Sequence, residues 1–351
     1  MNYFSRMNII LDDSQVRQNL YPFTRTRHTA DIRIGILSIR EKWEKLTRSK
    51  ISTFNTGKDD NIKIINANII PTLSDFNSIL ANENKPDVEE NKFKIINYPW
   101  QIFQLNDWAL RQDFELITKN RKSKPLSDTN KVIMPEMVFI EPGAVVEHSI
   151  LNASAGPIYI GKNAVVMEGN MIRGPFALCE GAVLKMGSRI YGATTIGPYS
   201  VAGGEIKNSV IFGYSNKAHD GYLGDSVIGE WCNLGAGTSN SNVKNNAGEV
   251  KYQLETNDDL IAAGNKAGLL MGDYSRAAIN TSFNTGTVVG VCCNIFGREM
   301  PGKYIPDFSW GNERYDFEKA LADITNWKKM KAAELSDIEK KFLQDLYIAN
   351  H

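Results

Sequence analysis

The sequence has few cysteines, no long apolar run and no excess of either charge. Four cysteines occur in 351 residues, without the density of a disulfide scaffold or the spacing of a metal site. No stretch reaches the roughly 18 apolar residues of a membrane span, and residues 1–17 lack the apolar core of a signal peptide. The 40 basic residues balance 40 acidic ones, so no net field attracts nucleic acid or an anionic membrane. We therefore expect a reduced, soluble, cytoplasmic protein with no nucleic-acid or membrane partner.

An internal repeat is the strongest feature that the sequence does contain. Segments recur in which an aliphatic residue opens a short turn and a small or aliphatic residue follows at a fixed offset. They begin at Ile140, Ile160, Leu178, Ile196, Ile228, Met271 and Val289. The steps 160 to 178, 178 to 196 and 271 to 289 are each 18 residues, which is three hexapeptides and one coil of a triangular prism. Stacked coils bury one aliphatic side chain per face in a continuous column.

The repeat predicts a mainly β protein in which residues 131–300 form a left-handed parallel β-helix of hexapeptide repeats. Ile160, Leu178 and Ile196 should stack above one another inside it. Two steps break the period: 196 to 228 is one coil plus 14 residues, and 228 to 271 is one coil plus 25. Insertions in a solenoid leave it as loops, commonly on the binding face, so we expect two functional loops there.

The segments on either side of the repeat have a different texture. Residues 1–98 alternate short apolar runs with helical stretches, which indicates a small α/β domain with a partly parallel sheet. Residues 99–130 should be a connecting helix, over 99–118, and a charged linker, with the helix docked on the first coil. Residues 301–351 should form a C-terminal helical cap, because 316–350 carries an apolar stripe and a solenoid needs its last coil covered.

The segment from Glu205 to Thr238 carries a specific motif. It contains Glu-Ile-Lys, then a Ser and a His, then Tyr-Leu-Gly-Asp, Ile-Gly and Asn-Leu-Gly-Ala-Gly-Thr, in that order. This frame resembles the acetyltransferase domain of the bacterial bifunctional UDP-N-acetylglucosamine pyrophosphorylase/glucosamine-1-phosphate acetyltransferase family. The asparagine-rich run that follows Asn233, together with Asn284-Thr-Gly-Thr-Val-Val-Gly-Val, resembles the Bacteroidetes-type variant of that family, in which the N-terminal domain is short.

The resemblance implies a catalytic centre around His219. His219 matches the family's general base, which takes a proton from the ammonium group of the amino sugar so that the amine can attack a thioester. Imidazole suits this task because its pKa lies near the operating pH. Asn242 falls where the family has an asparagine that orients the histidine. Backbone N–H groups near Ala236 would bind the carbonyl of acetyl-CoA, the cosubstrate, as an oxyanion hole.

The same resemblance implies a sugar-phosphate site and a homotrimer. Lys207, Tyr222 and Asn233 match residues that hold the sugar and its phosphate, and Arg189 is a candidate second phosphate contact. The final lysine of the family's sugar site has two candidates, Lys244 and Lys251, because the second insertion is longer in this chain. Family active sites lie between neighbouring prisms, and flat prism faces need partners.

The N-terminal segment is similar to the opening of a sugar nucleotidyltransferase. The family's glycine-rich phosphate loop is replaced by Leu11-Asp-Asp-Ser-Gln-Val-Arg, although glycines there normally let backbone N–H groups approach the phosphates. Arg17, Arg25 and Arg27 are the candidate nucleotide contacts, and Asp12 and Asp13 the candidate ligands of Mg²⁺. We expect that this domain turns over no nucleotide and that residues 125–351 keep acetyl transfer without it.

Three functions remain open from the sequence. The leading one is an acetyl-CoA-dependent N-acetyltransferase acting on a hexosamine 1-phosphate in UDP-N-acetylglucosamine biosynthesis. The second is a sugar-1-phosphate nucleotidyltransferase, forming a UDP- or dTDP-sugar, with the β-helix as a trimerisation platform. The third is a non-catalytic trimeric scaffold whose sites have decayed.

Overall fold

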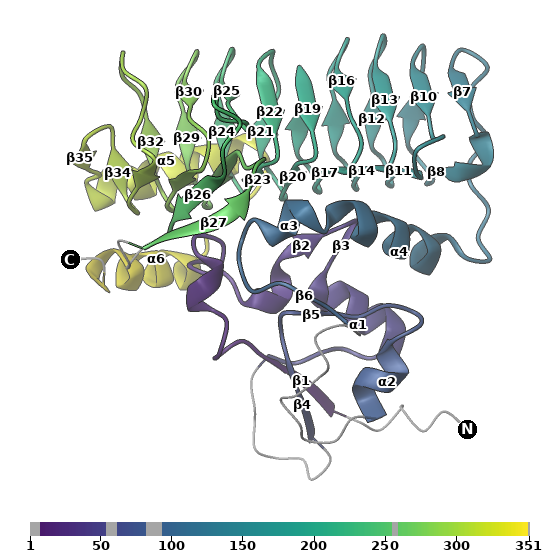
Figure 1. Ribbon diagram of the computed structural model, residues 1–351, viewed down its shortest axis with the longest axis horizontal. Helices are drawn as coiled ribbons and strands as arrows, with labels where there is room; N and C mark the ends of the chain where they lie inside the picture. The colour runs from purple at the N-terminus through teal and green to yellow at the C-terminus, as the bar shows by residue number, and fades with distance from the viewer. Residues whose placement is uncertain (1–7, 54–61, 82–92, 255–258, 350–351) are drawn as a thin grey trace.

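The predicted stack of coils is present in the computed structural model, which describes residues 8–53, 62–81, 93–254 and 259–349. Parallel strands wind into a three-sided β-helix whose coils follow one another along its axis (Figure 1). Ile160 pairs with Leu178, and Leu178 pairs with Ile196. Leu178 has no exposed surface. The prediction that these three residues stack in the core is confirmed.

Each of the three faces is one parallel sheet. The six-stranded sheet contains β7 (Lys131–Ile133), β10 (Ile150–Asn152), β13 (Met171–Arg173), β16 (Arg189–Ile190), β19 (Glu205–Lys207) and β22 (Tyr222–Gly224), and β25 (Ser239–Asn240) and β30 (Ser282–Phe283) form a further pair. The nine-stranded sheet contains β8 (Val138–Ile140), β11 (Ile158–Ile160), β14 (Phe176–Leu178), β17 (Thr194–Ile196), β20 (Val210–Ile211), β23 (Val227–Ile228), β28 (Leu269–Met271), β31 (Thr287–Val289) and β33 (Tyr304–Ile305). The ten-stranded sheet contains β9 (Val145–Val146), β12 (Val165–Val166), β15 (Val183–Leu184), β18 (Val201–Ala202), β21 (Asn216–Lys217), β24 (Asn233–Leu234), β29 (Arg276–Ala277), β32 (Asn294–Ile295), β34 (Ser309–Trp310) and β35 (Glu313–Arg314).

The first predicted insertion, between Ile196 and Ile228, is wrong. Ile211 pairs with Ile196 on one side and with Ile228 on the other, so this stretch is a complete extra coil. The coil was missed because its steps are 15 and 17 residues, shorter than the 18 of the regular repeat. A turn can lose a few residues without moving the inward side chain, because only the strand positions must stay in register.

The second predicted insertion is present and forms a hairpin. After β25 the chain leaves the prism as β26 (Val250–Gln253) and β27 (Leu260–Gly264), which pair antiparallel. The hairpin packs on the N-terminal part of the chain (Figure 1). The Tyr252 ring stacks on Trp100 at 5.3 Å between centroids, and Gln104 Nε2 donates to the Ala263 carbonyl at 2.8 Å. The insertion therefore holds two parts of the molecule together.

The N-terminal part is a small α/β unit, as predicted. β1 (Asn8–Asp12) and β4 (Ile62–Asn66) pair in parallel, while β2 (Arg33–Ile34) pairs antiparallel with β3 (Leu37–Ser38) and β5 (Ile69–Ile70) with β6 (Lys94–Ile95). The helices are α1 (Ile39–Thr47), α2 (Phe76–Ala81), α3 (Gln101–Gln104) and α4 (Asn106–Thr118). Ser38 and Glu41 form a capping box at the start of α1, which satisfies two amides that the first turn leaves without partners.

The predicted helix over 99–118 is present as α3 and α4, but it does not dock on the first coil. Asn106 Nδ2, at the start of α4, donates to the Ala193 carbonyl at 2.8 Å, beside β17. Leu110 and Ile117 pack with Cys179 on the coil before. Only beyond the helix does the chain reach the first coil, where Arg121 pairs with Glu141 at 2.6 Å. The helix therefore runs along the outer face of the nine-stranded sheet.

This docking joins the N-terminal unit and the β-helix in a single hydrophobic core. Apolar side chains on the outer surface of the nine-stranded sheet and the hairpin belong to the same buried cluster as Phe23, Trp43 and Trp100. On the sheet these are Val210, Phe212, Val227, Leu270 and Val288. A buried hydrogen-bond network reinforces the contact, because Thr195 Oγ1 donates to the Gly35 carbonyl at 2.9 Å. The expectation that residues 125–351 stand alone is at odds with this shared core.

The C-terminal tail forms two helices, α5 (Phe317–Met330) and α6 (Asp337–Ala349), packed along one edge of the prism. That edge joins the nine- and ten-stranded sheets and has left-handed residues in successive coils: Tyr199, Tyr214, Trp231, Tyr274, Cys292 and Phe308, with φ between 55° and 62°. Ile324, Leu335 and Leu343 cover it, and Lys331 Nζ donates to the Tyr199 carbonyl at 2.8 Å. The tail therefore covers an edge over several coils, not only the end of the solenoid. Within the described residues, none of the helices has the length and apolar character needed to cross a membrane.

Replacing Leu178 with Ala should lower the free energy of unfolding by about 2–5 kcal/mol, because the closed column cannot collapse around the cavity. Met186→Ala is the matched control, since Met186 is 66% exposed and its loss should cost under about 0.5 kcal/mol. Urea denaturation of both variants measures the difference. Equal midpoints for the two variants would contradict the assigned register.

Deleting residues 1–120 should expose the apolar surface of the nine-stranded sheet. We expect the remaining chain to bind a hydrophobic dye and to aggregate, as proteins with large exposed apolar patches do. Size-exclusion chromatography and dye fluorescence, with the full-length chain as control, measure this outcome. A soluble fragment with the thermal stability of the full-length chain would show that the shared core contributes little.

Candidate functional site

Turns of successive coils stack closely along the edge between the ten- and six-stranded sheets. We call this the His219 edge and define it as turns 203–204, 218–221 and 235–238. Gly237 N donates to the Asp220 carbonyl at 3.0 Å, which joins two of the turns directly. Glycine is required here because a Cβ on Gly221, at φ +120°, would lie 2.1 Å from the Thr238 carbonyl oxygen. His219 is exposed on this edge.

Ala236 lies on the same edge, one coil beyond His219. The amides of its neighbours are engaged, since Gly235 N donates to the Ala277 carbonyl at 2.9 Å and Gly237 N to that of Asp220 at 3.0 Å. Within the described residues the Ala236 N–H has no acceptor. Of the amides in this turn, it can therefore donate to a ligand without breaking a bond of the fold.

The outer face of the six-stranded sheet begins directly after this edge. Arg189, Glu205 and Tyr222 occupy equivalent first positions of three adjacent strands. Arg189 Nε lies 3.4 Å from Glu205 Oε2, and both side chains are largely exposed. Lys207 follows at the third position of its strand and is exposed. Two cations and a phenol therefore share one open face beside His219.

Tyr222 is held by a polar network that includes Asn242. The ring lies over Gly224, where a Cβ would approach the phenol oxygen to 2.3 Å. Asn242 Nδ2 donates to the Tyr222 hydroxyl at 3.2 Å and also to the carboxylate of Asp225. Burial, and then the Asp225 charge, raise the pKa of Tyr222 to about 12. Tyr222 is therefore a neutral hydrogen-bonding group at physiological pH.

Asn242 lies in this network and not against His219. Its partners among the described residues are Tyr222, Asp225 and, through its carbonyl, the Ala267 amide at 2.9 Å. Asp225 is almost fully buried and also accepts from Asn208 Nδ2 at 2.6 Å. The sequence reasoning overlooked Asp225, although it is the acid of the Tyr-Leu-Gly-Asp motif. In this chain Asn242 orients Tyr222.

Asn233 lies across the edge from Tyr222, on the outer surface of the ten-stranded sheet. It is half-buried, and its Oδ1 accepts from Asn216 Nδ2 at 3.4 Å. Its register partner is Arg276, which is buried and stacked over Trp327 at 5.5 Å. Asn233 and Tyr222 therefore point off different faces of one prism.

The two candidates for the last lysine of the sugar site lie in different places. Lys244 Nζ donates to the Glu249 carbonyl, inside the loop that leads to the hairpin. Lys251 is exposed on β26, in the hairpin that packs on Trp100. Neither has a described contact with Tyr222 or with its network, so the structure does not bring either of them to the His219 edge.

The acidic pair at the N-terminus is engaged by its own surroundings. Asp13 is nearly buried and binds Arg17 at 2.9 Å, His28 at 3.1 Å and the Thr29 amide at 3.0 Å. Burial opposes ionisation, but these three partners lower the pKa of Asp13. Asp12 accepts from the Ser14 amide and hydroxyl. Among the described residues no three metal-ligating side chains gather, so this arrangement does not fit Mg²⁺ without rearrangement.

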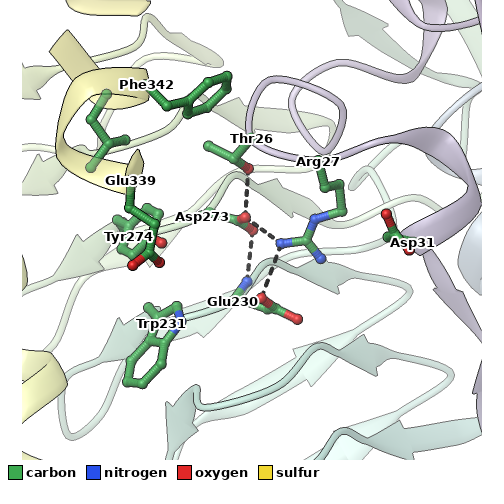
Figure 2. Close-up of a pocket in the computed structure, with 10 residues that line it drawn as sticks. Thr26, Arg27, Asp31, Glu230, Trp231, Asp273, Tyr274, Glu339 and Phe342 are labelled. Carbon is green, nitrogen blue, oxygen red and sulfur yellow. Dashed lines mark hydrogen bonds and ion pairs between the residues drawn. The ribbon is translucent and has the colours of Figure 1, made fainter. Parts of the chain in front are cut away.

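Arg25 and Arg27 anchor the N-terminal unit to turns of the β-helix. Arg25 Nε lies 3.1 Å from Asp307 Oδ2. Figure 2 shows Thr26 and Arg27 directed at Asp273, with Glu230 beside the guanidinium. Burial alone would lower the pKa of Arg27, but Asp273 and Glu230 raise it above its usual value. A nucleotide could recruit these two arginines only by displacing buried carboxylates.

Asp273 and Asp307 were missed by the sequence reasoning. They follow the aliphatic anchors in Met271-Gly-Asp and Ile305-Pro-Asp, and their carboxylates also accept the Glu230 and Val291 amides, each at 2.7 Å. A cavity of about 220 Å³ lies beside Asp273, between residues 26–31, turns 230–231 and 273–274, and α6. None of the residues assigned above to acetyl transfer lines it (Figure 2).

The fold and this edge define a class: a hexapeptide-repeat β-helix with an α/β unit docked on one face. Residues 8–58 and 56–122 match the family described as sugar nucleotidyl transferase. The chain is 29% identical over 236 residues to a bifunctional sugar-1-phosphate nucleotidylyltransferase/acetyltransferase of Sulfurisphaera tokodaii, which covers 64% of this chain and 50% of that protein.

Two further relatives carry the name bifunctional protein GlmU. That of Methanocaldococcus jannaschii is 31% identical over 198 residues, 56% of this chain and 42% of the relative. That of Gloeobacter violaceus is 28% identical over 153 residues, 43% of this chain and 31% of the relative. These matches confirm the resemblance to bifunctional nucleotidyltransferase/acetyltransferases. The chain spans about half the length, or less, of these curated relatives.

Replacing Arg27 with Met should destabilise the protein by about 3–5 kcal/mol, because it leaves the Asp273 carboxylate buried without its cation. The control is Arg17→Met, since the Arg17 side chain is 40% exposed and its pair should contribute under about 1 kcal/mol. Urea denaturation compares the two. A variant without Arg27 that unfolds like the wild type would show that the arginine does not anchor the two parts.

Proposed function

We propose that this protein is a transferase that moves the acetyl group of acetyl-CoA to the amine of a hexosamine 1-phosphate. The observation that carries the proposal is the His219 edge. There an exposed imidazole, an amide without an acceptor at Ala236 and the cations Arg189 and Lys207 lie on neighbouring coils. Relatives named as bifunctional nucleotidylyltransferase/acetyltransferases support the same reaction class.

His219 would act as the general base. It takes a proton from the sugar ammonium, and the freed nitrogen attacks the thioester carbonyl. The C–N bond forms as the C–S bond breaks, and the sulfur leaves as the thiol of coenzyme A after gaining a proton. The Ala236 N–H would stabilise the negative charge on the carbonyl oxygen during attack. An exposed imidazole suits this role because both substrates must reach it from solvent.

The sugar phosphate would bind on the open face of the six-stranded sheet. Arg189 and Lys207 supply positive charge for the phosphate, and a guanidinium can hold two phosphate oxygens at once. Arg189 now pairs with Glu205 at 3.4 Å, in an exposed pair that a phosphate can replace at little cost. The neutral Tyr222 hydroxyl is fixed by Asn242 and would contact the sugar.

A homotrimer would complete the site. The N-terminal unit covers the nine-stranded face, which leaves the other two faces for subunit contacts. Both present outward apolar residues in the first coils, with Ile150 45% and Met171 48% exposed on one face and Val145 46% on the other. Contact between unlike faces of neighbouring subunits would bring Asn233 of one subunit toward Tyr222 of the next. The four cysteines are free and buried, in keeping with a reducing cytoplasm.

Nucleotidyl transfer is the second candidate, and the match of residues 8–122 to the sugar nucleotidyl transferase family favours it. Arg17 is the one predicted nucleotide contact that stays substantially exposed. Pyrophosphate release from UTP or dTTP with a sugar 1-phosphate and Mg²⁺ tests this activity in the full-length chain. Release that Arg17→Ala abolishes would make the protein bifunctional.

Replacing His219 with Asn should lower the rate of thiol release from acetyl-CoA by about 10²- to 10⁴-fold, the usual contribution of a general base. The measurement uses the full-length chain and a panel of sugar 1-phosphates with a thiol reagent. His148→Asn is the matched control, because His148 is also exposed and sits in a turn at φ 50°. Equal rates for the two variants would remove His219 from the mechanism.

A further inference from the structure

Lys217 occupies a position that faces the interior of the β-helix. It is the second residue of β21 and pairs with Ala202 of the coil before. The other coils place an apolar residue at this position of the ten-stranded sheet: Val146, Val166, Leu184, Ala202, Leu234, Ala277 and Ile295. Lys217 is 1% exposed. The chain therefore buries an amine inside an otherwise apolar column.

The amine of Lys217 holds two turns of the His219 edge. Its Nζ donates to the Gly203 carbonyl at 3.3 Å and to the carbonyl of His219 itself. Gly203 belongs to the turn of the preceding coil, and His219 to the turn that follows Lys217. One side chain thus fastens the backbone of His219 from inside the prism to the coil beneath it.

The surrounding backbone leaves little room for this turn to move. A Cβ on Gly203 would lie 2.5 Å from the Ala218 carbonyl oxygen, and one on Gly204 would lie 2.7 Å from that of His219. On the other side, Gly237 N donates to the Asp220 carbonyl at 3.0 Å. The turn is therefore packed between two others, and the Lys217 ammonium sets the direction of its central carbonyl.

Stability alone does not account for a lysine at this position. Burial lowers the pKa of Lys217 to about 8, an effect that Asp220 partly opposes, so the folded state disfavours the charge. Replacing a buried charge by a well-packed apolar side chain is often neutral or stabilising. An aliphatic residue would continue the column without that penalty. The contact with His219 is what the lysine adds.

We propose that Lys217 is a positioning residue for His219, holding the main chain of the base from inside the β-helix so that the imidazole projects in one direction from the edge. The inference rests on the acetyl transfer proposed above and names a residue that acts through His219 without touching either substrate. A misplacement of about 1 Å in a reacting group can cost on the order of 10²-fold in rate. The tether should therefore appear in turnover more than in binding.

The test replaces Lys217 with Met in the full-length chain, with Leu234→Met as the matched control in the same column of the next coil. We expect kcat for thiol release to fall about 10- to 100-fold for Lys217→Met, with KM for acetyl-CoA within about twofold and the urea midpoint at pH 7 not lowered. Hydrogen exchange of peptide 218–221 should accelerate in this variant alone. Lys217→Arg, which keeps a buried donor, should recover part of kcat.

Each outcome decides the matter. A Lys217→Met variant with wild-type kcat overturns the positioning role while acetyl transfer stands. A fall in kcat that parallels a fall in the urea midpoint, with no local change in exchange, shows a purely structural lysine and overturns it too. If the Met variant does not fold, Lys217→Leu, the residue found at 184 and 234 in this column, carries the same comparison. A wild type that releases no thiol with any sugar 1-phosphate overturns the proposed function and the positioning role together.

Discussion

The structure depends on one constraint, which is that every coil places one inward side chain on each face of the prism. Because the strands of successive coils pair in strict register, the column of buried side chains fixes where each turn begins. The His219 edge, the aromatic edge under the C-terminal helices and the turns that present Asp273 and Asp307 all follow from this register. A coil may lose residues from a turn, as the one at Ile211 does, but cannot shift a strand.

The same constraint explains how the N-terminal unit is held. Turns at the edges of the prism are the places where a coil can display a polar group without disturbing the column. Asp273 and Asp307 use these places to bind Arg27 and Arg25, while the outward side chains of the nine-stranded sheet provide the apolar contact. Docking therefore occupies two of the arginines that the sequence offered for a nucleotide. Nucleotide chemistry, if present, depends on the groups that remain, with Arg17 foremost among them.

How far the sequence predicted the structure can be traced to particular residues. Ile160, Leu178 and Ile196 share an 18-residue step, so their stacking followed from spacing alone. Ile211 was missed because it is followed by Phe212 rather than glycine and its steps are shorter, and its omission turned a coil into an imagined loop. Lys217 was invisible for the same reason, since its inward position is apparent only once Ile211 is an anchor. The partners of Asn242, Arg25 and Arg27 depend on contacts between distant parts of the chain, which no local pattern encodes.

The central claim is that an acetyl group passes from acetyl-CoA to a sugar nitrogen at the His219 edge. The most direct measurement is the NMR spectrum of the product formed by the full-length wild type from ¹³C-acetyl-CoA and glucosamine 1-phosphate. The account predicts one labelled amide on the sugar nitrogen, with the phosphate still attached to carbon 1 and free coenzyme A in equal amount. A labelled ester on a sugar oxygen, or no labelled sugar from any hexosamine 1-phosphate, would contradict it.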